Sequence, residues 1–229
     1  KEIKCDHGGD WLNTRLNKSN LSQSKNIWRL IKEEDYVPID WQLDFRSGYR
    51  WSERTWYKNI SYAHLPGVDI KLPWELARMQ HLPQLALVCV AMRSSRFSSC
   101  NKAVIYSNEI QNQILDFIAQ NPPRFGVNWV CPMDIAIRVS NWLIAVDIIN
   151  DANFRFKKGF INIFKCSVYE HMLHILENLE WAETKRSNHY FSDIAGLIFS
   201  AAYLPQNDKT LGVLQFAIDE LISEAKLQF

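Results

Sequence analysis

The sequence lacks a marked excess of charge of either sign. Its 229 residues include 26 Lys and Arg and 25 Asp and Glu, which gives a formal net charge of +1. Domains that bind nucleic acid through bulk electrostatics usually carry a clear basic excess, so we expect no nucleic-acid partner. Long apolar runs are also missing, because the longest, residues 85–92, falls far short of the ~20 residues that a membrane-spanning helix requires. We therefore expect no membrane span.

Cysteine and named catalytic motifs are sparse. The five cysteines are odd in number and widely spaced, with no C-x-x-C pair, which argues against a disulfide framework and against a cysteine-based zinc site. Cys89, within the apolar run, is interpreted as a small buried thiol. No P-loop, G-x-G-x-x-G, G-x-S-x-G or H-E-x-x-H motif occurs, so none of the enzyme classes that these motifs mark is indicated.

Two histidines raise the question of a metal site. His171 and His174 stand three residues apart on an expected helix, which would bring two imidazoles to one face. No carboxylate or third histidine follows at ligand spacing, so we interpret them as a surface pair rather than as metal ligands. No metal and no cofactor is expected in this chain.

Apolar residues are plentiful, at 47% of the chain, and 13% of the residues are aromatic. Such a chain can bury enough apolar surface to offset the entropy of ordering, which excludes intrinsic disorder. Residues 1–23 mix Gly, Asn, Ser and Lys and are predicted to be loop or a poorly ordered arm. Residues 36–72 hold Pro, Gly and many large rings without sustained periodicity, which predicts an ordered irregular segment.

Helical periodicity begins at Pro73. Leu76, Met79, Leu82 and further apolar residues to Val90 recur at steps of three and four, which predicts a helix with one buried stripe. The same spacing predicts helices over residues 110–118 and 135–149, the latter with Pro132 in its first turn and Asp134 at its positive dipole end. Further helices are expected near residues 156–178, 190–204 and 209–227.

These segments predict an all-α protein of antiparallel helical hairpins. Strand alternation is almost absent, and no self-similar period marks a TPR, HEAT or ankyrin array, so a closed or partly closed ring is preferred to a solenoid. We divide the chain into an N-terminal arm with the first helix (1–35), the aromatic-rich irregular segment (36–72) and a toroid fragment (73–229).

Three ordered stretches carry a resemblance to a known family. The first comprises IDW at 39–41 and DIKLPWELARMQHL at 69–82. The second consists of NP at 121–122, GVNW at 126–129 and DIAIRVSNW at 134–142, and the third comprises SNHY at 187–190 and IAGL at 194–197. In this order, the three stretches resemble the helical domain of the heparinase II/III-like polysaccharide lyases, which include alginate lyases.

The resemblance implies an incomplete α/α toroid that is followed, in the family, by a C-terminal β-sandwich domain. It implies a polysaccharide lyase that cleaves a uronic-acid-containing chain by β-elimination, with an acidic polysaccharide or oligosaccharide as its partner. Asn188 would then be the hydrogen-bond donor that neutralises the uronate carboxylate, and His189 a second carboxylate contact or a proton-transfer group. For such a family we expect a periplasmic or secreted location.

The sequence departs from the family in one respect. The family's tyrosine acid/base lies beyond the last toroid helices, and this chain ends at Phe229 before any matching segment. The histidine and arginine groups of the β-sandwich, and any structural metal of that domain, are absent with it. We expect the 229-residue piece to be catalytically inactive alone.

Simpler interpretations stand beside the catalytic one. Ser187 or Asn188 directly before the apolar run that begins at Ile194 would make a good helix N-cap, and a cap and a site for an anionic group are not exclusive. A toroid glycoside hydrolase would need two carboxylates, for which Asp134 and Asp193 are candidates without any specific pairing. A non-catalytic carbohydrate-binding or scaffold domain is the third alternative.

Further polar residues are candidates for substrate binding. Arg138 and Asn141 lie three apart on one helix, with Asp134 four before Arg138, which fits a solvated ion pair as well as a substrate contact. Asn128 and Trp129 precede that helix and are either an aromatic platform for a sugar ring or a buried anchor. We expect Trp129 and Arg138 to line one concave surface with Asn188 and His189. Lys71, Glu75, Arg78 and His81 form a polar stripe that is either substrate-binding or a solvated face.

Overall fold

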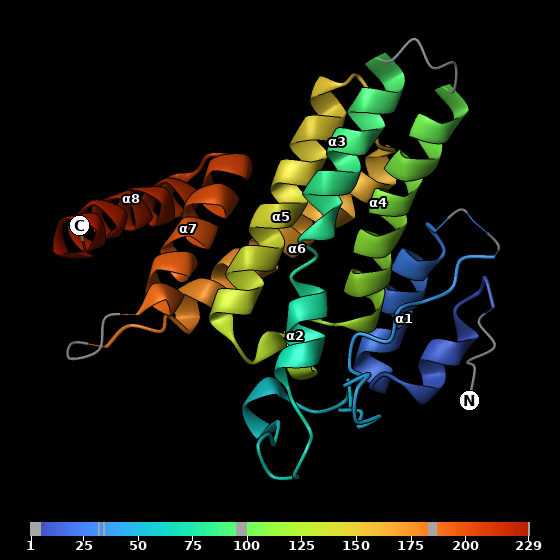
Figure 1. Cartoon of the computed structure of the whole chain (residues 1–229), viewed down its shortest axis with the longest axis horizontal. Helices are drawn as coiled ribbons and strands as arrows, with labels where there is room; N and C mark the ends of the chain where they lie inside the picture. The colour runs from blue at the N-terminus through green and yellow to red at the C-terminus, as the bar shows by residue number, and fades with distance from the viewer. Residues whose placement is uncertain (1–5, 32, 34, 95–99, 183–186, 229) are drawn as a thin grey trace.

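A computed structural model describes the chain except for residues 1–5, 32, 34, 95–99, 183–186 and 229, and α-helices dominate it (Figure 1). The described residues contain no β-strand, only the isolated bridges Leu43↔Arg50 and Trp56↔Phe125. The all-α prediction is confirmed. The helices are α1 (Lys18–Trp28), α2 (Lys71–Ala77), α3 (His81–Ser94), α4 (Cys100–Gln120), α5 (Pro132–Asp151), α6 (Lys158–Glu177), α7 (Asn188–Tyr203) and α8 (Asp208–Gln228), with the short 3-10 helices η1 (Asp10–Thr14), η2 (Tyr57–Asn59) and η3 (Val127–Trp129).

The helices form the predicted incomplete α/α toroid. Successive helices pair as hairpins, α3 with α4, α5 with α6 and α7 with α8, and α1 packs against α4. Helix α5 also packs between α3 and α7, so these three helices lie side by side and begin at the same end of the molecule (Figure 1). No helix within the described residues is long and apolar enough to span a membrane.

Two local predictions need correction. The apolar stripe from Leu76 to Val90 does not form one helix, because the chain breaks between α2 and α3 at Met79, whose φ is +51°. Residues 10–14 and 18–23 are not loop, since they form η1 and the beginning of α1; residues 1–5 of the predicted arm lie outside the described residues. The other predicted helices are present within a few residues of the expected bounds, except that α4 is longer.

Helix α5 shows why the periodicity was informative. Pro132 occupies its first turn and Asp134 is its acidic first-turn residue, as predicted. The stripe of Ile135, Val139 and Trp142 is fully buried in the main core, and it continues through Val146 and Ile149. Cys89 is buried in the same core, as predicted, and among the described cysteines none forms a disulfide.

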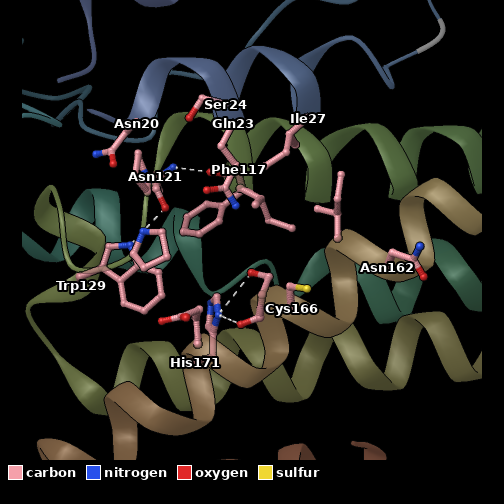
Figure 2. A pocket seen from close by; sticks show the side chains of 16 residues that line it. Asn20, Gln23, Ser24, Ile27, Phe117, Asn121, Trp129, Asn162, Cys166 and His171 are labelled. Atoms are coloured by element: carbon pink, nitrogen blue, oxygen red, sulfur yellow. Dashed lines mark hydrogen bonds between the residues drawn. The ribbon is translucent and has the colours of Figure 1, made fainter. Parts of the chain in front are cut away.

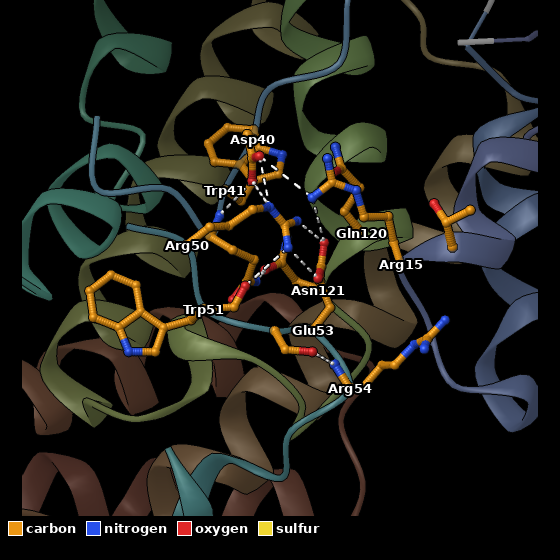
Figure 3. A network of polar contacts seen from close by, with 12 residues as sticks. Arg15, Asp40, Trp41, Arg50, Trp51, Glu53, Arg54, Gln120 and Asn121 are labelled. Atoms are coloured by element: carbon orange, nitrogen blue, oxygen red, sulfur yellow. Dashed lines mark hydrogen bonds and ion pairs between the residues drawn. The ribbon is translucent and has the colours of Figure 1, made fainter. Parts of the chain in front are cut away.

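The segment over residues 36–72 contains no α-helix until α2 begins at Lys71, and polar contacts order it (Figure 3). The Arg50 guanidinium donates to Asp40, with Nε 2.8 Å from Oδ2, and to both carboxylate oxygens of Glu53. Arg15 approaches the same two carboxylates at 3.6 and 3.8 Å. Gln42 joins the segment to the helices, since its Nε2 donates to Asn121 Oδ1 at 2.8 Å. Ion pairs and hydrogen bonds between side chains therefore order this segment, which has no α-helix before α2.

Helices α5 and α7 approach closely at one point. A Cβ added at Gly196 of α7 would lie 2.6 Å from Cβ and 2.8 Å from Cα of Ala136 on α5. Only a glycine therefore fits at this contact, which fixes the spacing of the two helices and hence of their N-termini.

Candidate functional site

The N-termini of α5 and α7 meet around the carboxylate of Glu180, which lies in the connection between α6 and α7. Glu180 Oε1 is 2.9 Å from His189 Nδ1, in the first turn of α7. Glu180 Oε2 accepts a hydrogen bond from the Met133 backbone N–H of α5 at 3.2 Å and lies 3.8 Å from Cys131 Sγ. A carboxylate is stabilised at a helix N-terminus because the unpaired N–H groups and the helix dipole favour negative charge. We refer to Cys131, Glu180 and His189 as the junction.

Buried carboxylates flank the junction on both sides. Asp193 of α7 accepts the Glu180 backbone N–H at Oδ2 (2.9 Å). Asp134 of α5 pairs with Arg78, whose Nε is 2.5 Å from Asp134 Oδ1, and Arg78 also pairs with Glu75 at 2.7 Å. Both aspartates are buried, so they are not the accessible carboxylate pair that a glycoside hydrolase needs.

Burial and negative charge shift the pKa values of groups at this end of the molecule. Burial raises the pKa of the Asp193 carboxyl to about 8, and the nearby Glu180 charge acts in the same direction. The pKa of the Cys131 thiol is raised above its usual range, first by burial and then by the charges of Asp134 and Glu180. The two helix N-termini thus stabilise the Glu180 carboxylate, whereas burial and the charges of Asp134 and Glu180 disfavour a thiolate at Cys131.

Asn188 and His189 begin α7 at the edge of the junction. Ser187 occupies the N-cap position, as one interpretation of the sequence expected, although its side chain makes no capping hydrogen bond. Asn188 is exposed and the His189 side chain retains 41% of its accessible surface. Because Glu180 binds His189 through Nδ1, the opposite ring nitrogen, Nε2, is the one left to exchange a proton with a ligand.

The structure places Asn128, Trp129 and Arg138 away from this surface. Their exposed fractions are 2%, 1% and 0%, so the expectation of one concave surface shared with Asn188 and His189 is not met in this arrangement. Arg138 Nε donates to His171 Nε2 at 3.1 Å, and Nη2 donates to the Asn128 carbonyl at 3.2 Å. These residues anchor the loop before α5 to the core, which is the interpretation that the sequence left open for Asn128 and Trp129. The solvated ion pair considered for Arg138 is wrong, because its side chain is fully buried.

The histidine pair was also misplaced by the sequence interpretation. His171 and His174 are buried rather than exposed, and each packs its ring against Trp129, with centroids 4.9 and 5.1 Å apart. Burial lowers the pKa of His174 to about 3 and that of His171 well below its usual value, so both rings are neutral. The spacing of three residues correctly predicted that both histidines lie on one face of the helix, but that face packs against the core.

The remaining predicted residues lie along α2, at the beginning of α3 and, in the case of Asn141, on α5. Lys71 is exposed at the first position of α2, and His81 Nε2 is 2.6 Å from Gln113 Oε1 of α4. Asn141 Nδ2 donates to the Arg78 carbonyl at 2.9 Å, which ties α5 to the break after α2. Arg78 and Asn141 therefore have structural partners close to the junction, and their role in substrate binding stays a prediction.

A separate cavity of about 290 Å³ lies between α1, α4 and α6 (Figure 2). Phe117 and Trp129 contribute aromatic walls, and Asn20, Gln23 and Asn162 are among its polar residues. Among the described residues that line the cavity, Glu170 is the only charged side chain, since His171 is neutral. Glu170 pairs with Arg124 at 2.9 Å. Without a cation of its own, this cavity is poorly suited to an anionic sugar.

The sequence interpretation missed Glu180 and Cys131. Glu180 belongs to no motif, and its partners come from the beginnings of two helices, of which α5 lies 47 residues away in the sequence. Cys131 immediately precedes Pro132, so its position beside a helix N-terminus was predictable, but its neighbours were not.

Comparison with known proteins agrees with the fold. The family model for the heparinase II/III N-terminus matches residues 10–229 of this chain. No curated protein and no solved structure matches it.

Proposed function

The chain belongs to the heparinase II/III N-terminal family, and from this premise we propose that it is the helical domain of a polysaccharide lyase. The proposed substrate is a uronic-acid-containing polysaccharide, which is cleaved by β-elimination. The observation that carries the proposal is the 2.9 Å contact between Glu180 and His189, directly beside the exposed Asn188 at the beginning of α7.

The chemistry explains why these residue types suit the reaction. A base removes the proton at C5 of the uronate, the electron pair forms the C4–C5 double bond, and the bond from C4 to the glycosidic oxygen breaks. Negative charge builds on the C5 carboxylate during this step, and an amide donor such as Asn188 stabilises it without competing for the proton. His189, held through Nδ1 by Glu180, presents Nε2 as the base, and Glu180 is a positioning residue in the same sense as the aspartate of a hydrolase triad.

The leaving glycosidic oxygen also needs a proton. We assign this step to the tyrosine that the family carries beyond its toroid helices, so the 229-residue chain should bind an acidic oligosaccharide weakly and remain catalytically silent. General acid and base act as a unit, and loss of either member costs orders of magnitude in rate.

The test uses the complete gene product with alginate, heparan sulfate, hyaluronan and chondroitin, each followed by the ultraviolet absorbance of the unsaturated product. Absorbance that grows with one polymer supports the proposal and identifies the substrate. Reducing ends released without that absorbance would indicate a hydrolase. Binding without any cleavage would indicate a carbohydrate-binding or scaffold domain, and either result would reject the lyase proposal.

A further inference from the structure

We propose that Cys131, Glu180 and His189 form a binding site for a zinc ion. The three residues come from the residue before α5, the connection after α6 and the first turn of α7, and the fold brings one sulfur, one oxygen and one nitrogen ligand together. The inference does not depend on the proposed lyase activity, because it concerns metal binding by the chain itself.

The geometry is close to that of a bound zinc ion. The candidate ligand atoms of the three residues all lie within 4.8 Å of one another. Glu180 stands between the other two, with Oε1 2.9 Å from His189 Nδ1 and Oε2 3.8 Å from Cys131 Sγ. Zinc–ligand distances of about 2.0–2.3 Å in a tetrahedral arrangement place neighbouring ligands about 3.3–3.8 Å apart. Small side-chain adjustments therefore suffice.

The carboxylates of Glu180 and Asp134 favour a cation at the junction and oppose the effect of the positive dipole ends of α5 and α7. Asp134 Oδ2 and Asp193 Oδ1 are buried oxygens for which the structure shows no hydrogen-bond partner, and each aspartate contacts the junction or its backbone. The charge of Arg78 is already taken up by Glu75 and Asp134. The negative charge that makes a free thiolate costly at Cys131 attracts a divalent cation, and a zinc-bound thiol loses its proton outright.

The ligand types select the metal. Thiolate together with imidazole and carboxylate suits zinc, whereas calcium and magnesium prefer oxygen ligands alone. Three protein ligands leave a fourth position, and the partly exposed His189 gives this position access to solvent. Asp193 would act behind the ligands by fixing the backbone of Glu180.

Zinc and a proton would compete for the same nitrogen. In the metal-free chain Nδ1 of His189 faces Glu180, whereas a bound zinc takes the Nδ1 lone pair and leaves the proton on Nε2. A zinc-loaded His189 cannot act as the base assigned to it above. Zinc should therefore inhibit elimination, provided that the proposed function holds.

The test measures metal binding by the 229-residue chain, stripped with a chelator and desalted, in the absence of any saccharide. Zinc chloride is titrated by calorimetry, and cobalt(II) is added to a second sample as a spectroscopic substitute. We expect zinc to bind at one site per chain in the titration. The cobalt(II) sample should show a thiolate-to-cobalt charge-transfer band. Cys131→Ser should abolish this band, and Cys131→Ser, Glu180→Gln and His189→Gln should each weaken zinc binding at least tenfold.

Matched controls separate this site from other thiols and imidazoles. Cys166→Ser and His7→Gln change exposed residues of the same types elsewhere in the chain, and both should leave the affinity and the band unchanged. Circular dichroism checks that each variant folds. The cobalt spectrum of the unaltered chain tests the site even if a variant does not fold. Absence of zinc binding, or a band that survives in Cys131→Ser, would overturn the proposal. Either failure would leave the lyase proposal standing, since that is tested by product formation alone.

Discussion

Replacing Gly196 by alanine tests the contact that sets the spacing of α5 and α7. The added Cβ would lie 2.6 Å from Cβ of Ala136, 2.8 Å from its Cα and 3.3 Å from Cδ1 of Ile175. The Cα of Ala136 belongs to the α5 backbone and its Cβ is bonded directly to it. The steric clash can therefore be relieved only if the two helices separate, and not by rotation of a side chain. Overpacking of this kind costs about 1–3 kcal/mol.

The helix propensity of alanine acts in the opposite direction. Alanine is more favourable than glycine in a helix by about 1 kcal/mol, so the net loss expected for Gly196→Ala is about 0–2 kcal/mol. Gly212 of α8 provides the matched control, because nothing lies within 4 Å of a Cβ added there. Gly212→Ala should therefore stabilise the chain by about 1 kcal/mol.

Urea denaturation followed by circular dichroism measures both variants against the unaltered chain, and thermal melts should differ by about 2–4 °C for each kcal/mol. The double variant Gly196→Ala, Ala136→Gly removes the 2.6 Å contact with Cβ of Ala136 but keeps the 2.8 Å contact with Cα, so it should recover part of the loss. If Gly196→Ala were as stable as Gly212→Ala, the close approach of α5 and α7 would be wrong, and so would the placement of the two N-termini around Glu180.

The remaining predictions concern buried charges. Arg78→Gln should destabilise the chain by about 3 kcal/mol because it leaves the buried Asp134 carboxylate unpaired, and adding Asp134→Asn should recover most of that loss in the same urea assay; equal stability of single variant and parent would show that Arg78 is free to bind substrate. Asp116 is a buried residue of α4 whose carboxylate accepts hydrogen bonds from the Tyr36 hydroxyl and the Ile39 backbone N–H. Burial raises its pKa to about 7, so the folded state favours the proton, and the stability associated with it is present below pH 3.8 and lost as the pH rises through 7. The stability of Asp116→Asn relative to the parent should therefore increase between pH 4 and pH 8, and a constant difference would contradict the burial of an uncompensated charge there. Zinc at saturating concentration should raise the melting temperature of the parent but not that of Cys131→Ser, since only a ligand that binds the folded state stabilises it.

The sequence predicted the helices well because their buried stripes are local patterns. Residues 135–149 specify α5 through spacing alone, and Pro132 and Asp134 mark where it begins. The break at Met79 was missed because the apolar spacing continues through it, although the backbone takes a positive φ there. A pattern of spacing reports which side chains are buried and not whether the helix is continuous.

The candidate site was only partly predictable for a related reason. Asn188 and His189 were identified from motif resemblance, and both lie at the beginning of α7. Arg138 illustrates the opposite case, since charge alone suggested exposure while the structure buries it over the Phe117 ring, 4.4 Å from the centroid. Glu180 was invisible because its contacts with His189 and Met133 exist only after α5, α6 and α7 are packed.

We propose that Asn188 and His189 perform the first step of an elimination reaction. The most direct measurement is the rate of unsaturated product formation by the complete gene product and its variants, on the polymer that gives the largest absorbance change. We predict that His189→Gln lowers kcat about 10²–10⁴-fold and Asn188→Ala about 10²–10³-fold, while His7→Gln leaves it unchanged. Unaltered turnover in both His189→Gln and Asn188→Ala would show that neither side chain takes part in the reaction.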